Sequence, residues 1–210
     1  MISDKFVGKY MRQAKLVGED RNPCYSRKIG IVIVRTYGDG DSKILGTGYN
    51  GPPRKTPHCT DPDYLKEVFW PQLTVTEKTA AASAAGCTIQ GGHSDESLCN
   101  IVCEKFGNEK ICPRKIVGAA SGQRLELCSC AHGETNAIVN CSEDLHGAIM
   151  FCWCGVPCFE CTKLIINAGI KTIYVVKWAN DYSRGSRWLF AKKGVEIIEH
   201  PEEYYLNLGE

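Results

Sequence analysis

Thirteen cysteines in a chain of 210 residues set the first limit on how this sequence can fold. The number is odd, so disulfide pairing alone would leave one thiol over. Residues Met1 to Tyr10 mix charged side chains with isolated apolar ones, which is not the pattern of a secretory signal. We therefore expect a cytoplasmic protein whose cysteines are metal ligands and buried thiols, because a reducing compartment does not support a disulfide framework.

The overall charge argues against two kinds of partner. With 25 basic and 24 acidic residues the formal net charge is +1, so no global field attracts nucleic acid or an anionic membrane surface. The sequence contains no apolar stretch of about 18 residues, the length that spans a membrane. Residues 1–55 carry a surplus of basic side chains, which indicates a small anionic ligand or a solvated basic face. We expect neither nucleic acid nor a membrane as a partner.

The N-terminal quarter contains one helix pattern and two strand patterns. Asp4 to Leu16 has apolar residues at helical spacing after a capping Ser3. Lys28 to Thr36 is a β-branched run typical of a buried strand. Ile44 to Tyr49 follows a turn signal, Asp39-Gly40-Asp41, so the two strands are predicted to form a hairpin.

The rest of the chain divides into an irregular segment and a regular one. Between Pro52 and about Gly122 the sequence is polar, Ala-rich and Cys-containing, with short helices predicted over 64–70 and 76–85. After it, helix and strand patterns alternate three times. The helices are predicted over 132–141, 158–168 and 186–193, and the strands over 148–153, 172–178 and 195–199.

This order of elements predicts an α/β fold, a mixed five-stranded sheet with helices on both faces. The helix over 186–193 separates the last two strands, and a right-handed crossover makes them parallel. A chain of this length buries a sizeable core, so we expect residues 1–210 to form a single domain with a Cys-rich insertion at about 56–122. The insertion has few long apolar runs, and we expect it to lack a strong core of its own.

Two short segments carry the strongest functional signal. His132-Gly133-Glu134 begins one predicted helix, and Pro157-Cys158-Phe159-Glu160-Cys161 begins another. Cys158 and Cys161 lie on a first helical turn, so both sulfurs face one side, where the helix N-terminus favours thiolates. His132 is then a third zinc ligand and leaves a fourth tetrahedral position open, as in catalytic zinc sites. Glu134 lies close to the metal and is able to transfer protons.

Either segment alone is ambiguous. A C-x-x-C pair also occurs in redox centres and in structural zinc sites, and H-x-E is common in unrelated sequences. Together, each at the start of a helix, they match the signature of zinc-dependent nucleobase deaminases.

These segments, with Lys28-Ile-Gly-Ile-Val-Ile33 and Gly46-Thr-Gly-Tyr-Asn-Gly51, resemble the deoxycytidylate (dCMP) deaminases. The resemblance implies a three-layer α/β/α, cytidine-deaminase-like fold. It also implies zinc-dependent hydrolytic deamination of dCMP, or of a 5-substituted dCMP, to a dUMP-type product and ammonia, with Glu134 moving the protons. Family members are often homo-oligomers regulated by deoxynucleoside triphosphates, and we expect the same here. Two positions depart from the family, because Gly133 replaces the usual Ala and Cys154 lies near a usual Thr or Ser.

The resemblance also indicates where a nucleotide binds. Asn50, on the loop after the second strand, resembles the residue that hydrogen-bonds the sugar, although Asn-Gly is also a turn signal. Ser26 and Arg27 are candidates for the 5′-phosphate, and an ordinary surface charge is an equal interpretation of Arg27. Asn136 would face the same side of its helix as His132, with a helix-capping or core-polar role as the alternative.

The cysteines outside the catalytic segments indicate a second metal. Some longer dCMP deaminases hold a structural zinc, with one ligand before the first strand and one after the Gly-Tyr-Asn-Gly loop. Cys24 and Cys59 occupy these positions here. A closed tetrahedral zinc would stabilise the insertion, which supplies the other ligands. The predicted ligand set is Cys24, Cys59, Cys103 and Cys112, with Cys99 or His93 as substitutes.

The other cysteines are not assigned to a metal. Cys141 and Cys152 lie at core positions of a helix and a strand and fit as ordinary reduced thiols. Cys128 and Cys130 lie on a predicted strand, and we expect that their thiols are not both on one face, so they are left unassigned.

Two other functions stay open at this point. A deaminase acting on cytidine or adenosine in RNA or DNA would need a basic surface for several phosphates, which the net charge and the acidic insertion do not favour. A non-catalytic, zinc-stabilised nucleotide-binding protein would have no use for the proton carrier Glu134.

Overall fold

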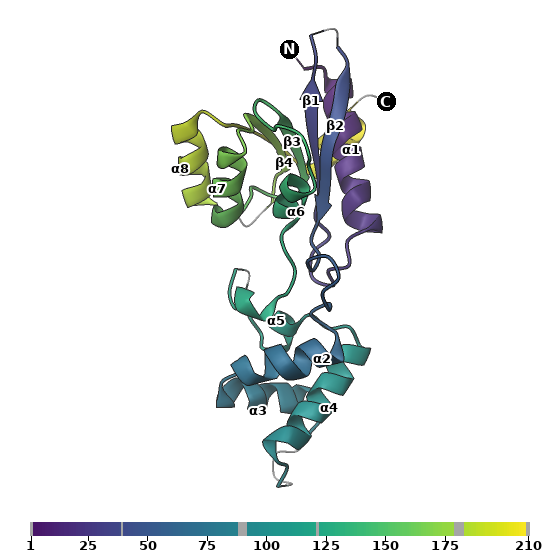
Figure 1. Cartoon of the computed structure of the whole chain (residues 1–210), viewed down its shortest axis with the longest axis vertical. Coiled ribbons are helices and arrows are strands. Elements are labelled where there is room, and N and C mark those ends of the chain that lie inside the picture. Colours follow the sequence, from purple (N-terminus) through teal and green to yellow (C-terminus); the bar gives the residue numbers. More distant parts are fainter. Residues whose placement is uncertain (1, 39, 88–91, 121, 179–182, 209–210) are drawn as a thin grey trace. The chain divides into compact units, whose positions relative to one another are not determined.

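The computed structural model of this protein divides into two compact units (Figure 1). Unit 1 comprises residues 1–23, 27–50 and 131–210, and unit 2 comprises residues 24–26 and 51–130. The insertion expected at about 56–122 lies within unit 2. The residues that the structure describes are 2–38, 40–87, 92–120, 122–178 and 183–208.

Unit 1 is built on a five-stranded mixed sheet in the order β2-β1-β3-β4-β5. Its strands are β1 (Gly30–Thr36), β2 (Ser42–Tyr49), β3 (Ile149–Trp153), β4 (Thr172–Val176) and β5 (Glu196–His200). β1 pairs antiparallel with β2 and with β3, whereas β3, β4 and β5 are parallel. The predicted mixed sheet with two parallel strands at its end is confirmed.

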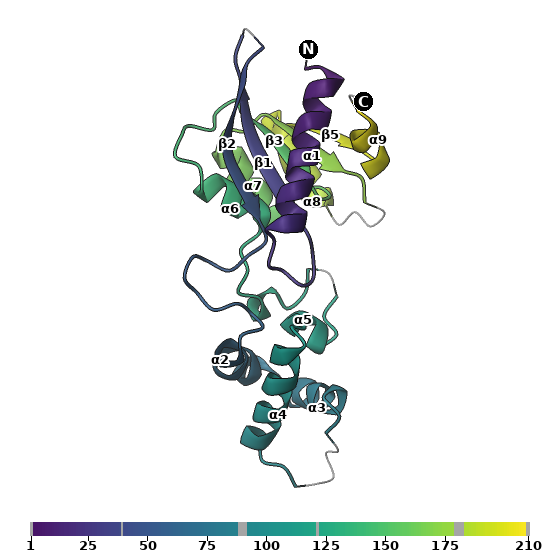
Figure 2. The ribbon, with the colours of Figure 1, turned by 90° about the vertical axis from the view of Figure 1, so that its right-hand side faces the viewer.

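Helices cover both faces of this sheet. On one face lie α1 (Asp4–Asp20) and α9 (Glu202–Asn207), as Figure 2 shows. On the other lie α6 (Gly133–Val139), α7 (Phe159–Asn167) and α8 (Arg184–Lys193). The three-layer α/β/α arrangement is therefore the one expected.

The alternation of side chains along β1 explains why the sheet has a core on each face. Ile31 and Ile33 pack into the cluster beneath α6, α7 and α8, and Val32 and Val34 pack into the cluster beneath α1. All four are fully buried. A strand that is covered on both faces has apolar residues at every position rather than at alternate ones. The β-branched run over 28–36 has this pattern, and it predicted the strand.

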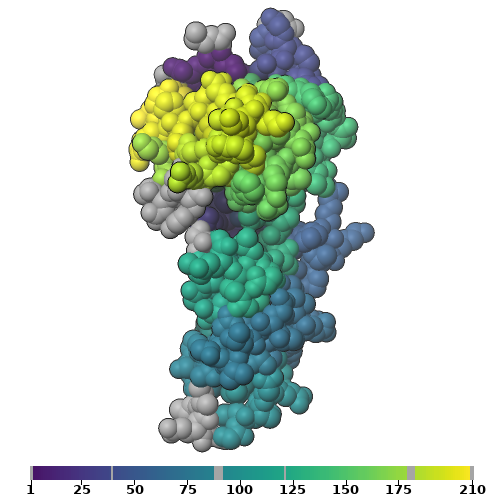
Figure 3. Space-filling model, turned by 90° about the vertical axis from the view of Figure 1, so that its left-hand side faces the viewer, coloured from purple at the N-terminus to yellow at the C-terminus, as the bar shows by residue number. Residues whose placement is uncertain are grey.

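The outermost helix of the α6–α7–α8 layer shows the amphipathic division of a surface helix. Phe190 of α8 is fully buried in the core, while Trp188 is 61% exposed. Figure 3 shows the outer surface of α8 in yellow-green. α8 ends at Gly194, whose φ of 64° is left-handed, a conformation that glycine adopts without strain.

Element boundaries differ from expectation by a few residues at most positions. α1 extends past the predicted end at Leu16 to Asp20, and α6 is shorter than the predicted 132–141. His132 itself is extended and only caps α6, so the helix proper begins at Gly133. The turn predicted at Asp39-Gly40-Asp41 includes Asp39, which lies outside the described residues.

Unit 2 is mainly helical. Its helices are α2 (Pro62–Tyr64), α3 (Val75–Ala84), α4 (Asp95–Asn108) and α5 (Pro113–Ile116), and a π-helical turn at Leu65–Phe69 follows α2. Thr74 and Glu77 form a reciprocal capping box at the start of α3. The predicted helices over 64–70 and 76–85 correspond to the turn after α2 and to α3, whereas α4 was not predicted.

Unit 2 also has a hydrophobic core, so the expectation that this segment lacks one is wrong. Leu65, Phe69, Val102 and Phe106 are almost fully buried in one cluster with Trp70. These side chains come from helical turns spaced along the chain, with polar residues between them. No long apolar run therefore marks the core in the sequence.

Within the described residues, the structure contains no helix with the length and apolar character needed to cross a membrane.

Candidate metal and catalytic sites

The three predicted catalytic ligands converge in unit 1. Nδ1 of His132 lies 3.4 Å from Sγ of Cys158 and 3.4 Å from Sγ of Cys161. One ligand atom from each residue lies within 4.8 Å of the others. His132 is the N-cap of α6 and Cys158 the N-cap of α7, so the starts of two neighbouring helices bring the donors together.

The two thiols do not ionise independently. The pKa of Cys158 falls to about 4, chiefly because Cys161 and then His132 hydrogen-bond to its sulfur. The pKa of Cys161 is raised by that same hydrogen bond, by burial and by the nearby Glu134 carboxylate. A cation at this point would stabilise both thiolates at once. One imidazole and two thiols fit a catalytic zinc, with one tetrahedral position left for water.

Glu134 is the buried carboxylate beside these donors. It is only 4% exposed, and burial is the main reason why its pKa is raised. Its Oε2 is buried and makes no hydrogen bond to any described residue. A buried carboxylate with one unpartnered oxygen, next to candidate metal ligands, is unfavourable for stability and suits a group that takes up and releases protons.

Asn50 reaches this site from the end of β2. Its Oδ1 accepts a hydrogen bond of 2.8 Å from the backbone N–H of Gly133, and its side chain is buried. His132, the N-cap residue of α6, makes no side-chain cap bond of its own. Asn50 therefore satisfies an N–H at the start of α6 from a neighbouring element, a contact that sequence reasoning did not predict.

The other predicted substrate contacts are placed differently. Asn136 donates a hydrogen bond of 2.8 Å to the carbonyl of Tyr49, so its amide joins α6 to the end of β2. The guanidinium of Arg27, in unit 1, lies 5.5 Å from the ring centre of Trp178. Ser26 is exposed and belongs to unit 2.

Two glycines of the Gly-Thr-Gly-Tyr-Asn-Gly segment let α6 lie directly on β2. A Cβ at Gly48 would be 2.2 Å from the carbonyl oxygen of Gly133 and 2.3 Å from the N of Ala137. A Cβ at Gly46 would be 2.6 Å from the carbonyl oxygen of Ala137. The alternating glycines are the sequence signal for this close approach, and it is this approach that brings Asn50 to α6.

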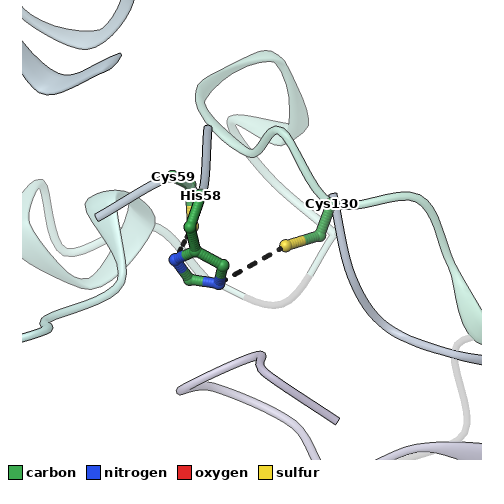
Figure 4. A group of neighbouring side chains, drawn as sticks. All are labelled: His58, Cys59 and Cys130. Atoms are coloured by element: carbon green, nitrogen blue, oxygen red, sulfur yellow. Dashed lines mark hydrogen bonds between the residues drawn. The ribbon is translucent and has the colours of Figure 1, made fainter. Parts of the chain in front are cut away.

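A second group of candidate metal ligands lies in unit 2 and consists of His58, Cys59 and Cys130 (Figure 4). Nδ1 of His58 lies 3.8 Å from Sγ of Cys59, and its Nε2 lies 4.0 Å from Sγ of Cys130. Nδ1 also accepts a hydrogen bond of 3.2 Å from the backbone N–H of Thr60. That bond leaves the ring proton of neutral His58 on Nε2, facing Cys130.

Further thiols surround this group. Cys130 hydrogen-bonds with Cys128, Cys24 and Cys59, and these contacts, the first above all, raise its pKa. Hydrogen bonds from Cys130 and Cys59 lower the pKa of Cys128 to about 2, whereas the bond to Cys128 is the main reason why the pKa of Cys59 rises to about 12. One thiolate is favoured at the expense of its neighbours, as in a thiol cluster that lacks a balancing cation.

The membership of this cluster differs from the predicted ligand set. Cys24, Cys59 and Cys112 interact within it, but Cys103 does not reach it. Sγ of Cys103 lies 3.7 Å from Sγ of Cys99, on the face of α4 that packs into the core of unit 2. His93 lies beside Ser97 at the start of the same helix.

The prediction that Cys128 and Cys130 point to opposite sides is wrong. Residues two apart on a strand point to the same face, so a strand would not have separated these thiols. Residues 128–130 do not form a strand, and the two thiols hydrogen-bond to each other.

The three-layer fold and the His132 site define a zinc-binding protein of the cytidine-deaminase-like class. The family described as "Cytidine and deoxycytidylate deaminase zinc-binding region" matches residues 5–177, and this chain belongs to that family.

Similar proteins agree with this membership. A deoxycytidylate deaminase of Schizosaccharomyces pombe is 26% identical over 91% of this chain, which spans only 42% of that protein. Deoxycytidylate deaminases of Mycobacterium phage D29 and Enterobacteria phage T4 are 27% and 26% identical, over 84% and 87% of their own lengths and 75% and 90% of this chain.

A solved structure has the same fold. The dCMP deaminase of cyanophage S-TIM5, crystallised with dCMP and dUMP, superposes with a TM-score of 0.53. The match covers 95% of this chain and 99% of that one at 19% identity.

Proposed function

We propose that this protein is a zinc-dependent hydrolase that converts dCMP, or a 5-substituted dCMP, to a dUMP-type product and ammonia. The observation that carries the proposal is the unpartnered, buried Oε2 of Glu134 beside three convergent metal donors. The deoxycytidylate deaminases among the similar proteins, and the dCMP and dUMP in the cyanophage enzyme, support dCMP as the substrate.

His132, Cys158 and Cys161 would hold the catalytic zinc. When bound, the metal supplies activation of a water molecule at neutral pH. Glu134 takes a proton from the attacking water on its carboxylate and delivers it to N3 of the base. It then takes the proton of the hydroxyl newly bound at C4 and gives it to the amine, which leaves as ammonia. Burial raises the pKa of Glu134, which lets the carboxyl hold this proton between the two transfers.

The nucleotide contacts are proposed from the side chains around this centre. Asn50 binds the sugar, and its bond to Gly133 fixes the side chain in one orientation. Arg27, which lies over the ring of Trp178, binds the 5′-phosphate, and the role of Ser26 stays a prediction from the sequence. The amide of Asn136 is engaged by the carbonyl of Tyr49, so we assign to it the support of the Asn50 loop.

A second, structural zinc in unit 2 is the other part of the proposal. The thiols linked by hydrogen bonds are those of Cys24, Cys59, Cys128 and Cys130, and four sulfurs make the closed tetrahedral set of a structural site. His58 then donates from Nε2 to the sulfur of Cys130 rather than binding the metal, and Cys112 lies beside the set. This revised ligand set replaces Cys103 and Cys112 with Cys128 and Cys130.

Three further expectations rest on the resemblance and the sequence. They are a homo-oligomeric state, regulation by a deoxynucleoside triphosphate and a cytoplasmic location. The location agrees with all thirteen cysteines being present as thiols in the described structure.

The test is an ammonia-release assay with a panel of cytosine nucleosides and their mono- and triphosphates. We expect turnover with dCMP and none with the nucleosides, because the basic phosphate contacts contribute only to nucleotides. Release from a cytosine-containing oligonucleotide but from no free nucleotide would favour the nucleic-acid deaminase. Binding of dCMP without release of ammonia would favour the non-catalytic alternative.

A further inference from the structure

The two sulfurs of the catalytic centre lie in different surroundings. Cys158 is exposed, so water can solvate its thiolate, whereas Cys161 is only 2% exposed. A buried thiolate needs a hydrogen-bond donor from the protein, since the charge is otherwise poorly stabilised.

A donor lies next to Cys161. Oγ1 of Thr135 is 3.8 Å from Sγ of Cys161. Thr135 belongs to the first turn of α6 and directly follows Glu134, so the helix that carries the proton carrier also carries this hydroxyl. When Cys161 is a thiolate it has no proton to give, and the hydroxyl of Thr135 must be the donor.

We propose that Thr135 is a positioning residue of the catalytic metal centre, whose hydroxyl donates to the buried Cys161 thiolate, stabilises its charge and holds its sulfur in the orientation that binds the metal. The inference rests on the proposed function, because it takes Cys161 to be a zinc ligand. Outer partners of this kind fix the orientation of a metal ligand, and their loss lowers metal affinity and activity.

The test compares Thr135→Val, which has the same branching but no hydroxyl, with Thr135→Ser, which keeps it. We expect zinc affinity, measured by competition with a chelator, to fall about tenfold in Thr135→Val, with a similar fall in kcat and little change in KM. Thr135→Ser restores both. Unchanged affinity and kcat in Thr135→Val would overturn the proposal.

The matched control is Thr162→Val. Thr162 lies near the start of α7, as Thr135 lies near the start of α6. Its hydroxyl donates a hydrogen bond of 3.0 Å to the backbone carbonyl of Cys158 rather than to a sulfur. Its loss should alter thermal stability without altering the metal centre. An equal fall in affinity in both valine variants would assign the effect to general packing and overturn the proposal.

A readout independent of turnover is the ¹¹³Cd resonance of cadmium-substituted protein. We expect the resonance of the catalytic centre to move in Thr135→Val and to return in Thr135→Ser, while any resonance from the sulfur-rich cluster of unit 2 stays in place. Cys161→Ser separates the two levels of the argument. If its catalytic resonance persists unchanged, the ligand assignment fails. If that resonance is lost but Thr135→Val leaves it unmoved, only the role of Thr135 fails.

Discussion

At the scale of single residues, the catalytic centre places polar groups where burial makes them costly. Glu134 is buried with an unpartnered oxygen, and Cys161 is a buried thiol beside that carboxylate. Asn50 is buried as well, but its oxygen is satisfied by Gly133. The difference separates the roles of the two oxygens, because the satisfied Oδ1 of Asn50 fixes the orientation of its side chain while the unsatisfied Oε2 of Glu134 is available for proton transfer.

Glu134→Gln should lower turnover by about a hundredfold to ten-thousandfold, because the amide keeps the shape but carries no proton. Zinc content should stay as in the wild type. The metal-free variant should melt at a higher temperature at neutral pH. Burial raises the pKa of Glu134 in the folded state, so stability is lost as the pH rises through that pKa, and Gln does not share the loss.

The control for this variant is Glu196→Gln, at an exposed carboxylate on β5. Neither turnover nor the melting temperature should change there. If Glu134→Gln keeps more than a few per cent of wild-type turnover, the proton carrier has been assigned to the wrong residue.

At the scale of elements, the contact between β2 and α6 decides the geometry of the site. The glycines at 46 and 48 remove the side chains that would keep the helix from the strand. Two hydrogen bonds then join the elements. Asn50 accepts one from the backbone N–H of Gly133, and Asn136 donates the other to the carbonyl of Tyr49. The position of His132 thus depends on the small size of residues in a different element.

Gly48→Ala should lower the free energy of unfolding by about 3 kcal/mol, because the added Cβ meets backbone atoms that cannot turn aside. Denaturant titration measures this, and zinc affinity should fall as α6 is displaced. Gly38→Ala is the control, since a Cβ there meets no atom within 4 Å. Equal stabilities of the two variants would show that the close approach is not required.

Gly133→Ala tests the departure from the family pattern. A Cβ at this position would lie 3.1 Å from Ile29 and 3.2 Å from Ile31, at side-chain atoms that can move by a few tenths of an ångström, and 3.3 Å from the backbone Cα of Tyr49. We expect a cost of about 1 kcal/mol by denaturant titration, with zinc affinity kept. A cost as large as that of Gly48→Ala would mean that the core cannot adapt to the usual Ala.

In unit 2 the cysteines divide between a core role and a metal role. Cys59→Ser should reduce zinc from two ions per chain to one and lower the melting temperature, because a closed site contributes directly to folding. Cys103→Ser should lower the melting temperature and keep both ions, since it places a hydroxyl in an apolar core. Elemental analysis of the purified proteins measures the zinc content per chain. A single zinc per wild-type chain would contradict the second site.

At the scale of the whole molecule, the two units have separate hydrophobic cores. Unit 1 has one core on each face of its sheet, and unit 2 has a single core among short helices. We propose that the two still form one deaminase domain, in which unit 2 is the insertion. Among the described residues the longest helix of unit 2 is α4, with 14 residues, so tertiary contacts rather than helix propensity must hold the unit together. The proposed zinc would add to these contacts.

Removal of metal should therefore act unequally on the two units. After treatment with a chelator, backbone amides of α4 in unit 2 should exchange with deuterium faster by about tenfold or more, while those of β1 in unit 1 stay protected. Hydrogen exchange read by mass spectrometry gives both values from one sample. Equal loss of protection in α4 and β1 would show that the sheet unit depends on the metal as strongly as unit 2.

Much of the fold could be predicted because its signals are local. The β-branched run of β1, the helix starts at His132 and Cys158, and the spacing of Cys158 and Cys161 each depend on a few neighbouring residues. The catalytic ligands could be paired across 26 residues because both helix starts carry a recognisable motif.

What only the tertiary structure decided was the choice of partners between distant segments that carry no such motif. Asn50 accepts a hydrogen bond from Gly133, which lies 83 residues further along the chain. Cys130, rather than Cys103, forms a hydrogen bond with Cys59. Spacing along a helix or strand is set by backbone geometry, so the sequence by itself determines it. Which thiol reaches which depends on how distant segments pack. Cys103 of α4 packs into the core of unit 2, while the irregular segment 128–130 brings the thiols of Cys128 and Cys130 to Cys59.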